Sequence, residues 1–320
     1  MIIVGAGMAG LLAANLLKHH NPVIYEAQSS LPNNHSAVLR FRSPEIGELL
    51  HIPFRKVKMI KASVPWRNPV TDALAYSRKT TGVSRSDRSI HSVDYNTHDR
   101  WIAPNDFIQR MARGLDIRYN YNIAFDQKEK VLSTIPMPSL LQILNYDRED
   151  LIFDYVSGFN IRAELINVDA YVSLYIPNPG FPFNRISITG NQLIIEFALP
   201  GKGFHIDVIT EDKEFIEESI DTALKILGLE TEPINVEVKS QQYQKILPIP
   251  EEERKRAIYW TSVVTGRAFQ LGRYATWRPS LLMDDLVKDI RIIDRWINDG
   301  EAAPYEMEKH HVRSGSLQGR

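Results

Sequence analysis

IIVGAGMAG at residues 2–10 and VIYEA at residues 23–27 decide the fold of this chain. The apolar run at residues 1–4 is typical of a buried strand, and leucines recur at helical spacing over residues 11–17. Glu26 follows the second apolar stretch, 21 residues beyond Gly5. A strand, a glycine-rich turn, a helix, a second strand and an acid in this order begin a dinucleotide-binding unit. The sequence therefore predicts an α/β fold with a Rossmann-like domain.

Each glycine of this turn has its own physical reason. Gly5 permits the tight turn, Gly7 lets the backbone approach a pyrophosphate, and Gly10 lets the helix pack closely on the strand. The start of the helix offers free N–H groups and a positive dipole end to phosphates. Glu26 can accept hydrogen bonds from ribose hydroxyls and would repel a 2′-phosphate. The motif predicts an adenosine diphosphate moiety, and by itself it fits FAD and NAD equally.

Composition narrows the classes of protein that fit. The 320 residues are 43% hydrophobic and 24% charged, which predicts a packed globular chain. A formal net charge of −1 gives no broad attraction to nucleic acid or anionic lipid. The absence of cysteine excludes disulfides, thiolate catalysis and iron–sulfur clusters. With no apolar stretch of membrane-spanning length, we expect a cytoplasmic protein without membrane contact.

Two later segments extend the first motif. VLSTIPMPSLLQIL, residues 131–144, follows it as a strand, a proline-bearing turn and a helix, and GRYATWRPSLLMDDLV occupies residues 272–287. Together with VGAGMAGLLAANLL at residues 4–17, these segments resemble FAD-dependent amine oxidases and UDP-galactopyranose mutases, which belong to the glutathione-reductase-like flavoproteins. The chain is a reduced-size version of that pattern, and the tyrosine and aspartate spacing after its Gly-Arg pair is altered. The resemblance implies FAD as the cofactor.

The resemblance also implies a Rossmann-like FAD-binding domain into which an antiparallel substrate domain of the α+β type is inserted. Alternating apolar and polar residues over 152–207 indicate the antiparallel sheet, and residues 103–113 and 211–228 indicate helices. The expected FAD-binding domain is discontinuous and comprises residues 1–50, 100–145 and 245–300. The expected substrate domain comprises residues 146–244, with an irregular cap at 51–99 and a flexible tail at 304–320.

The candidate FAD contacts come from the first motif, the loop after Glu26 and the carboxyl-terminal motif. A basic residue in the extended stretch at 36–43 could reach the pyrophosphate or the flavin edge. The resemblance places a helix beginning near Ser280 with its N–H groups toward the flavin, where they would stabilise an anionic reduced ring. The candidates are Gly5, Gly7, Met8, Ala9, Gly10, Glu26, Ala27, Arg40, Gly272, Arg273, Leu281, Leu282 and Met283.

Tyr274, Trp277 and Arg278 are the candidate catalytic residues. The related flavoenzymes line the face opposite the flavin with aromatic side chains, and an Arg or Tyr binds a substrate carboxylate or phosphate. Packing of Tyr274 and Trp277 in the core is an equally open alternative. Residues 55–98 carry further basic and aromatic side chains that could hold a phosphorylated sugar or stack a base, or form a solvated loop.

The nine histidines predict no metal site. His19–His20 and His310–His311 are adjacent pairs, and neighbouring side chains on a helix diverge by about 100°. We therefore expect neither pair to share an ion.

An FAD-dependent oxidoreductase of the amine-oxidase type is the leading hypothesis, acting on a carbon next to nitrogen in a small-molecule or nucleotide-linked amine. A second glycine fingerprint is missing from the sequence, so reoxidation by dioxygen or another acceptor is expected rather than a separate NADPH domain. One alternative is a phage-type flavoenzyme that processes amino-acyl-modified thymine in DNA. Others are a mutase-like isomerase that uses reduced flavin without net redox change, and a non-enzymatic escort of prenylated proteins.

Overall fold

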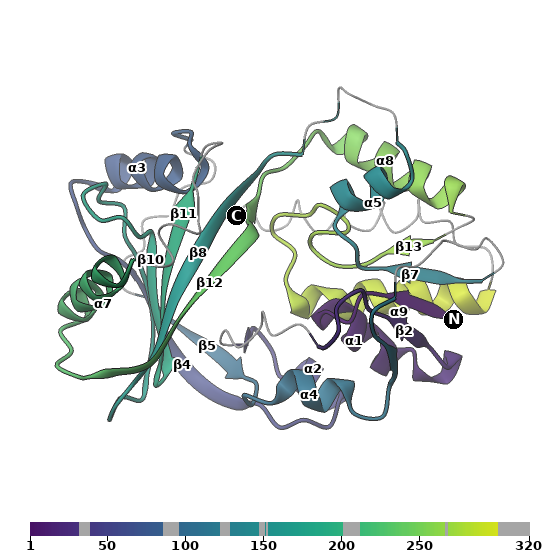
Figure 1. Ribbon diagram of the computed structural model, residues 1–320, viewed down its shortest axis with the longest axis horizontal. Coiled ribbons are helices and arrows are strands. Elements are labelled where there is room, and N and C mark those ends of the chain that lie inside the picture. The colour runs from purple at the N-terminus through teal and green to yellow at the C-terminus, as the bar shows by residue number, and fades with distance from the viewer. Residues whose placement is uncertain are drawn as a thin grey trace.

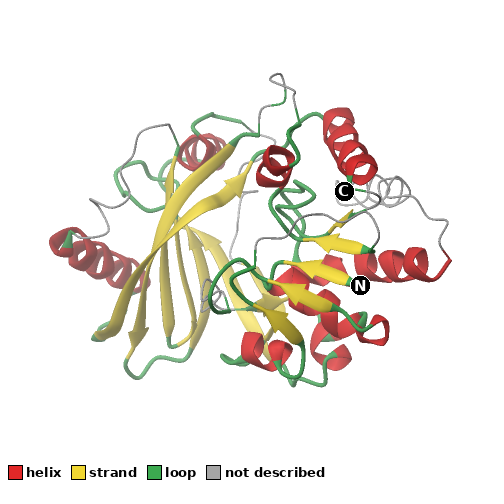
Figure 2. Cartoon of the chain, turned by 45° about the vertical axis from the view of Figure 1, so that its right-hand side comes forward, coloured by secondary structure: helices red, strands yellow, loops and turns green. Residues whose placement is uncertain are grey.

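Two sheets stand side by side in the computed structural model of the protein (Figure 1). The structure describes residues 1–31, 39–85, 96–121, 129–146, 151, 153–200, 212–265 and 268–299. The smaller sheet has the strand order β13-β7-β1-β2-β6, and the larger has the order β12-β8-β11-β10-β9-β4-β5-β3. Figure 2 shows the long strands of the larger sheet curling beside the short strands of the smaller one.

The smaller sheet is parallel throughout and confirms the Rossmann-like prediction. β1 (Ile2–Val4) lies at its centre, with Ile2 opposite Val23 on one side and Val131 on the other. Short runs of apolar residues are what a parallel sheet covered on both faces requires. The other strands are β2 (Val23–Tyr25), β6 (Asp116–Arg118), β7 (Val131–Ser133) and β13 (Phe269–Gln270).

Helices cover both faces of the smaller sheet (Figure 1). α1 (Met8–Leu16) and α9 (Met283–Asp299) pack together on one face, where Leu12 and Ile290 belong to the main apolar core. α5 (Met137–Ile143) and α8 (Glu251–Val264) form a second apolar cluster on the other. The short helices α2 (Glu45–Leu49) and α4 (Phe107–Ala112) pack beside α9 and α1.

The larger sheet is antiparallel except where β4 runs parallel to β9. One of its faces is apolar and packs against α7 (Lys213–Leu227), with Ile186, Ile188 and Ile220 buried between them. This arrangement confirms the antiparallel sheet and the helix that the sequence predicts. The strands are β3 (Arg40–Phe41), β4 (Arg55–Ser63), β5 (Asn96–Ile102), β8 (Tyr155–Leu165), β9 (Ala170–Tyr175), β10 (Arg185–Gly190), β11 (Gln192–Leu199) and β12 (Pro233–Ile246).

The prediction of irregular backbone over residues 55–98 is wrong for most of its described part. β4 is a nine-residue strand, and α3 (Pro69–Thr81) is a regular helix. The sequence carried the signals of α3, because Asn68 caps the first turn by accepting a hydrogen bond from the Thr71 N–H at 2.9 Å, and Gly82 ends the helix at φ 79°. β4 was missed because charged residues lie on both of its faces, Lys56 and Lys58 on one and Arg55 and Lys61 on the other, so the alternation of apolar and polar residues is interrupted.

β3 lies inside the segment 1–50 that the resemblance assigns to FAD binding, yet it pairs with β5 of the larger sheet. Residues 1–50 therefore contribute strands to both sheets. The predicted tail at 304–320 lies outside the described residues. Among the described residues, no helix combines the length and apolar character needed to cross a bilayer.

Candidate functional site

The glycine-rich turn is locked against β7. Gly5 has φ 99°, and a Cβ built on it would lie 2.3 Å from Thr134 Oγ1. A Cβ on Gly10 would lie 2.0 Å from the Gly5 carbonyl oxygen, so α1 approaches the turn more closely than any side chain permits. The backbone at these two positions requires glycine. The second motif supports the turn directly, since the Thr134 hydroxyl donates to the Val4 carbonyl at 2.8 Å.

Open space lies at the start of α1. Gly7 is the N-cap residue, and a Cβ placed on it would meet no atom within 4 Å. No side chain of the described residues caps α1, so within that part of the chain the first-turn N–H groups at Met8 and Ala9 have no side-chain acceptor. An uncapped helix start with free approach at a glycine is a cradle for a phosphate.

Glu26 is held against the turn at the end of β2. Its carboxylate is 8% exposed and accepts the Ala6 N–H at 2.7 Å and the Gln28 N–H at 2.9 Å. A carboxylate has about four acceptor sites, so capacity for two ribose hydroxyls remains. Ala27, the neighbouring candidate, is exposed at the same edge.

The carboxyl-terminal motif meets the first motif at Gly272. This residue has φ 108°, and a Cβ on it would lie 3.2 Å from the Ala9 Cβ. The next residue, Arg273, is partly buried, and its Nε lacks a hydrogen-bond partner among the described residues. Three segments far apart in the sequence thus meet around the start of α1, as the resemblance implies.

The predicted donors at Leu281, Leu282 and Met283 are only partly available. α9 begins at Met283 rather than near Ser280. The Leu281 N–H donates to the Arg278 carbonyl at 3.1 Å, and the Leu282 N–H donates to the Asp285 carboxylate at 2.9 Å. Two of the three predicted donors are therefore engaged inside the protein. The Leu282 N–H is engaged because Asp285, an acid in the first turn of α9, caps that helix.

Trp277, a candidate catalytic residue, packs in the core of this structure. The side chain is 0% exposed, and its indole N–H donates to the Leu247 carbonyl at 2.9 Å. It packs edge-on against Phe153 with ring centroids 5.0 Å apart. Tyr274 lies in the same cluster, with its hydroxyl donating to the Tyr243 carbonyl at 3.0 Å. Of the two alternatives that the sequence left open, core packing describes both aromatics.

The guanidinium of Arg278 forms an ion pair with a buried carboxylate. It pairs with Asp289 of α9, which is 2% exposed, and its Nε donates to Thr276 Oγ1 at 2.9 Å. It also lines a cavity of about 200 Å³ beside Arg254 and Trp277. The ion pair fixes the carboxyl-terminal motif to α9, which indicates a positioning residue rather than a substrate contact.

The second face of the larger sheet is polar and cationic. Register pairs Arg40 with Ile102, Arg100 with Val57, Lys61 with Ser173 and Arg185 with Tyr175. Paired residues and residues two apart along a strand share a face, so these four cations lie on the face opposite α7. Figure 1 shows α7 on the outer side of the sheet, which directs the polar face toward the parallel sheet. We call Arg40, Lys61, Arg100 and Arg185 the cationic face.

The cations of this face act on one another. Burial lowers the pKa of Arg40 to about 10, and Arg185 adds to the effect. Burial and the charges of Arg100, Arg40 and Arg185 lower the pKa of Lys61 to about 8. For Arg185 burial also acts to lower the pKa, but its ion pair with Glu196 outweighs it. Arg273 lies in the same field, because burial and Arg185 both lower its pKa.

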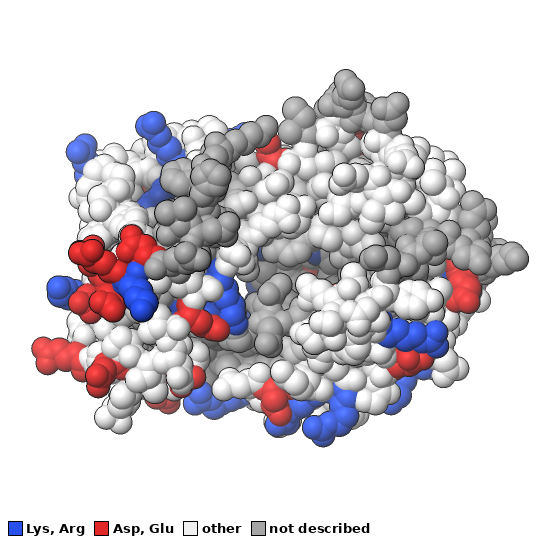
Figure 3. Space-filling model, in the orientation of Figure 1, with Lys and Arg blue, Asp and Glu red and all other residues white. Residues whose placement is uncertain are grey.

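Several buried polar atoms around the cationic face lack protein partners among the described residues. They are Ser63 Oγ, Ser187 Oγ and Asn160 Oδ1 on the larger sheet. The Gln270 amide, at the end of β13 in the smaller sheet, also lacks a partner among these residues. Buried polar groups are normally hydrogen-bonded, so unpaired ones mark a place where a ligand or water completes them. Figure 3 shows the surface hollowed between the two halves, with Lys and Arg atoms at its wall.

Sequence reasoning missed Lys61, Arg100 and Arg185. Alternation within each strand could have placed them opposite the apolar positions, but only the pairing of strands far apart in the chain gathers them. Two residues of α3, Lys79 and Tyr76, pack inward instead, whereas Arg78 is exposed. Lys79 donates to the Ile176 and Asn178 carbonyls at 3.1 and 2.8 Å, and Tyr76 packs on Tyr175.

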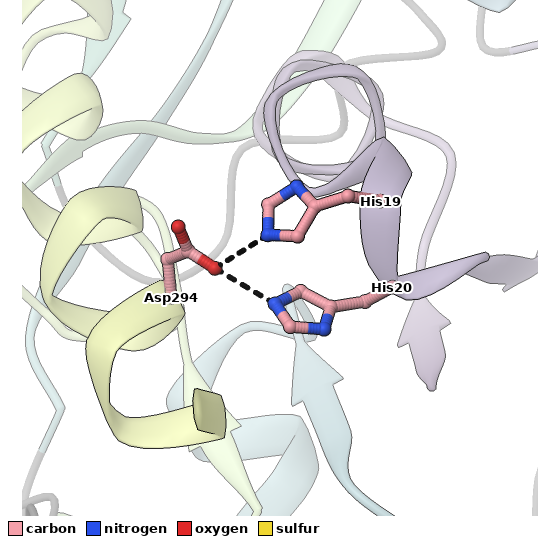
Figure 4. A group of neighbouring side chains, drawn as sticks. All are labelled: His19, His20 and Asp294. Atoms are coloured by element: carbon pink, nitrogen blue, oxygen red, sulfur yellow. Dashed lines mark hydrogen bonds and ion pairs between the residues drawn. The ribbon is translucent and has the colours of Figure 1, made fainter. Parts of the chain in front are cut away.

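The adjacent histidines converge, which corrects the expectation that they diverge. They lie in the turn η1 (Lys18–His20), and their ring centroids are 4.1 Å apart. His19 Nε2 and His20 Nε2 lie 2.8 and 2.7 Å from the same atom, Asp294 Oδ1 (Figure 4). Burial acts to raise the pKa of Asp294, but the hydrogen bonds with His20 and His19 outweigh it and hold that pKa below its usual range.

No protein-family model and no curated protein matches the sequence. The structure is similar to that of reduced UDP-galactopyranose mutase, with a TM-score of 0.68 and 13% identity over 95% of this chain and 96% of that one. It is similar to a CLA-producing fatty acid isomerase from P. acnes, with a TM-score of 0.57 and 12% identity over 94% and 98%. A third similar structure is aklavinone-11 hydroxylase with FAD and aklavinone, with a TM-score of 0.55 and 13% identity over 93% of this chain and 62% of that one.

Proposed function

This chain has the fold of FAD-dependent oxidoreductases, and from that premise we propose that it is a flavoenzyme that oxidises an anionic amine. The observation that carries the proposal is the meeting of the glycine turn, Glu26 and Gly272 around an uncapped helix start. FAD supplies a ring that accepts a hydride from a carbon next to nitrogen. The residues of this chain hold that group and present the substrate to it.

The chain's own residues fit FAD. The free N–H groups at the start of α1 and the open space at Gly7 suit a pyrophosphate, and Glu26 keeps acceptor sites for ribose hydroxyls. The unpaired Nε of Arg273 and the unpaired Gln270 amide lie at the carboxyl end of β13. In a doubly wound fold, ligands bind at the carboxyl ends of the parallel strands.

The cationic face suits the substrate's anionic group. Arg40, Lys61 and Arg100 have Glu196 and Asp284 as carboxylates in their field. Burial is the largest cause of the lowered pKa of each, and repulsion from neighbouring cations lowers it further. A carboxylate or phosphate would relieve this repulsion. The same field lowers the pKa of a substrate ammonium, which favours the deprotonated amine that hydride donation requires.

Cofactor release is the direct test of the proposal. We expect the purified chain to be yellow and to release one FAD per chain on denaturation, measured by absorbance and chromatography. Anaerobic addition of anionic amines, such as amino acids and nucleotide-linked amines, should then bleach the flavin. A colourless chain that takes up no FAD would contradict the flavoenzyme proposal, and unchanged absorbance across the panel would contradict the amine.

Replacing Arg40 by methionine should weaken anion binding without destabilising the protein. A hydrogen bond to a charged group contributes about 1.5–3 kcal/mol, so we expect sulfate affinity to fall roughly 10- to 100-fold. The fold lowers the pKa of Arg40, so removing its charge should leave the melting temperature unchanged or higher. Calorimetric titration with sulfate and thermal unfolding measure the two effects.

Arg110→Met on α4 is the matched control, because Arg110 is exposed, pairs with Asp106 and does not belong to the larger sheet. It should bind sulfate as the unchanged chain does. If Arg40→Met loses FAD and keeps sulfate binding, Arg40 contacts the cofactor, as the sequence pattern predicts.

Sulfate binding should weaken as the pH rises through about 8. Lys61 has a pKa of about 8, so it is charged below that pH and neutral above it, whereas sulfate keeps its charge. A bound anion favours the charged lysine, so the midpoint in the complex lies above that of the free protein. We expect an affinity loss of about tenfold between about pH 7 and pH 10, measured by calorimetry. Lys61→Arg should flatten this dependence, and an unflattened profile would assign it to another group.

Mutase-like chemistry without net redox change is the second candidate. The cationic face that suits a carboxylate also suits the diphosphate of a nucleotide-linked sugar. Oxygen uptake separates the two, because an amine oxidase consumes dioxygen and an isomerase consumes none. The DNA-modifying alternative depends on the basic and aromatic segment 78–95. Lys79 packs inside the protein, Arg78 and Arg85 are exposed, and residues 86–95 lie outside the described residues, so this alternative gains no support here.

A further inference from the structure

The cluster of His19, His20 and Asp294 lies outside the proposed flavin site. α1 and α9 pack together, and both begin beside the glycine turn. His20 follows the start of α1 by 12 residues and Asp294 follows the start of α9 by 11. At 1.5 Å per residue, the cluster lies roughly 16–18 Å from the turn. A ligand bound by the cluster would therefore lie along these two helices at a distance from the glycine turn.

We propose that His19, His20 and Asp294 form a binding site for a divalent transition-metal ion of the zinc type. The three ligand atoms, His19 Nε2, His20 Nε2 and Asp294 Oδ1, lie within 4.8 Å of one another. Two imidazoles and a carboxylate are ligands that Zn²⁺ takes in sites with one open position. Mg²⁺ and Ca²⁺ prefer oxygen ligands, so the nitrogen donors select against them.

The hydrogen-bonded arrangement needs only a small expansion to admit the ion. The two histidine nitrogens now lie 2.8 and 2.7 Å from Asp294 Oδ1. Zinc bonds of about 2.0–2.1 Å at tetrahedral angles place ligand atoms roughly 3.3 Å apart. An opening of about half an ångström is available, because the His19 side chain is 53% exposed and that of Asp294 is 32% exposed.

Without a metal ion, several polar groups are crowded around one oxygen atom of Asp294. Two imidazole nitrogens and the Asn298 amide, at 3.4 Å, all approach one carboxylate oxygen. Three nitrogen atoms thus crowd one oxygen atom. An ion removes this conflict, since each Nε2 then presents a lone pair and the carboxylate supplies negative charge.

The ion would fasten the beginning of the chain to its last described helix. Asp294 is 275 residues from His19 and 274 residues from His20 along the chain. Binding of the ion therefore stabilises the folded arrangement over the unfolded chain. A structural ion is therefore expected to raise the melting temperature whether or not FAD is bound.

Zinc titration of the tag-free chain tests the site. After treatment with a chelator and its removal, calorimetry with ZnCl₂ should show one equivalent per chain, and MgCl₂ should show none. Zinc should raise the melting temperature by at least about 3 °C. Because His310 and His311 form another adjacent pair, the titration is made in the His310→Gln/His311→Gln background.

Asp294→Asn should abolish both zinc binding and the zinc-dependent shift, whereas Asp221→Asn, at an exposed carboxylate of α7, should keep both. Should Asp294→Asn fail to fold, His19→Ala at the more exposed ligand should still lower zinc affinity roughly tenfold or more. The absence of saturable zinc binding, or binding unchanged in these variants, would overturn the site. Flavin content, measured in parallel, is expected to stay constant in every variant.

Discussion

A Gly7→Val chain is expected to be folded and nearly colourless. Gly7 has φ −70° and ψ 174°, which valine adopts without strain, and a Cβ there meets no atom within 4 Å. The added side chain would occupy the space through which the pyrophosphate reaches the N–H groups of α1. Each such charge-assisted hydrogen bond contributes about 1.5–3 kcal/mol, so bound FAD per chain should fall at least roughly tenfold. The ratio of flavin to protein absorbance measures this loss.

Gly10→Ala is the matched comparison, with the opposite outcome. Its Cβ would lie 2.0 Å from the Gly5 carbonyl, which is backbone and cannot turn aside. We expect this variant to lose about 1–3 kcal/mol of stability or more, measured by chemical denaturation. Gly7→Val loses only the preference of an N-cap position for glycine over an apolar residue, so it should lose about 1 kcal/mol or less. If Gly7→Val retained FAD with unchanged affinity, the cofactor would not lie at the start of α1.

Trp277→Ala is expected to cost about 3–5 kcal/mol of unfolding free energy. Trp277 is fully buried and contacts Phe153 and Tyr243, and its indole N–H is bonded to Leu247. Its φ of 48° is unusual for a residue with a side chain. Trp277→Gly relieves that backbone cost of about 1 kcal/mol, so it should be at least as stable as Trp277→Ala. Denaturant midpoints of the two variants give the order.

Trp277→Phe separates packing from catalysis. Phenylalanine keeps most of the buried ring, so turnover by the folded variant should stay close to that of the unchanged chain. A large loss of turnover with unchanged stability would restore Trp277 as a residue that acts in the reaction.

The local pattern of the first 26 residues was enough to predict the dinucleotide unit. Each part of that unit depends on neighbours in the sequence: Gly5 and Gly10 are required by the backbone of one turn, and Glu26 ends the next strand. The same reasoning predicted α7, because Asp212 caps it and Gly228 ends it. Short-range rules of this kind can be read without a tertiary structure.

The candidate site was predicted less completely. Gly272, predicted as a contact of the same cofactor as the first motif, lies against Ala9 of α1, whereas Trp277 and Arg278 point into apolar and ion-paired surroundings. Aromatic and basic side chains serve packing and substrate binding equally well, and the sequence does not state which way a loop turns them. The engaged N–H groups at Leu281 and Leu282 depended likewise on where α9 begins.

The sequence by itself determined a Rossmann-like half with a cradle for a dinucleotide, because every element of that motif is specified within one short stretch. Only the tertiary structure decided the cationic face and the histidine cluster. Arg40, Lys61 and Arg185 meet through strand pairing across more than a hundred residues, and His19 meets Asp294 through the packing of two helices. Such long-range contacts are set by the burial of apolar faces elsewhere in the chain, which local patterns do not reveal.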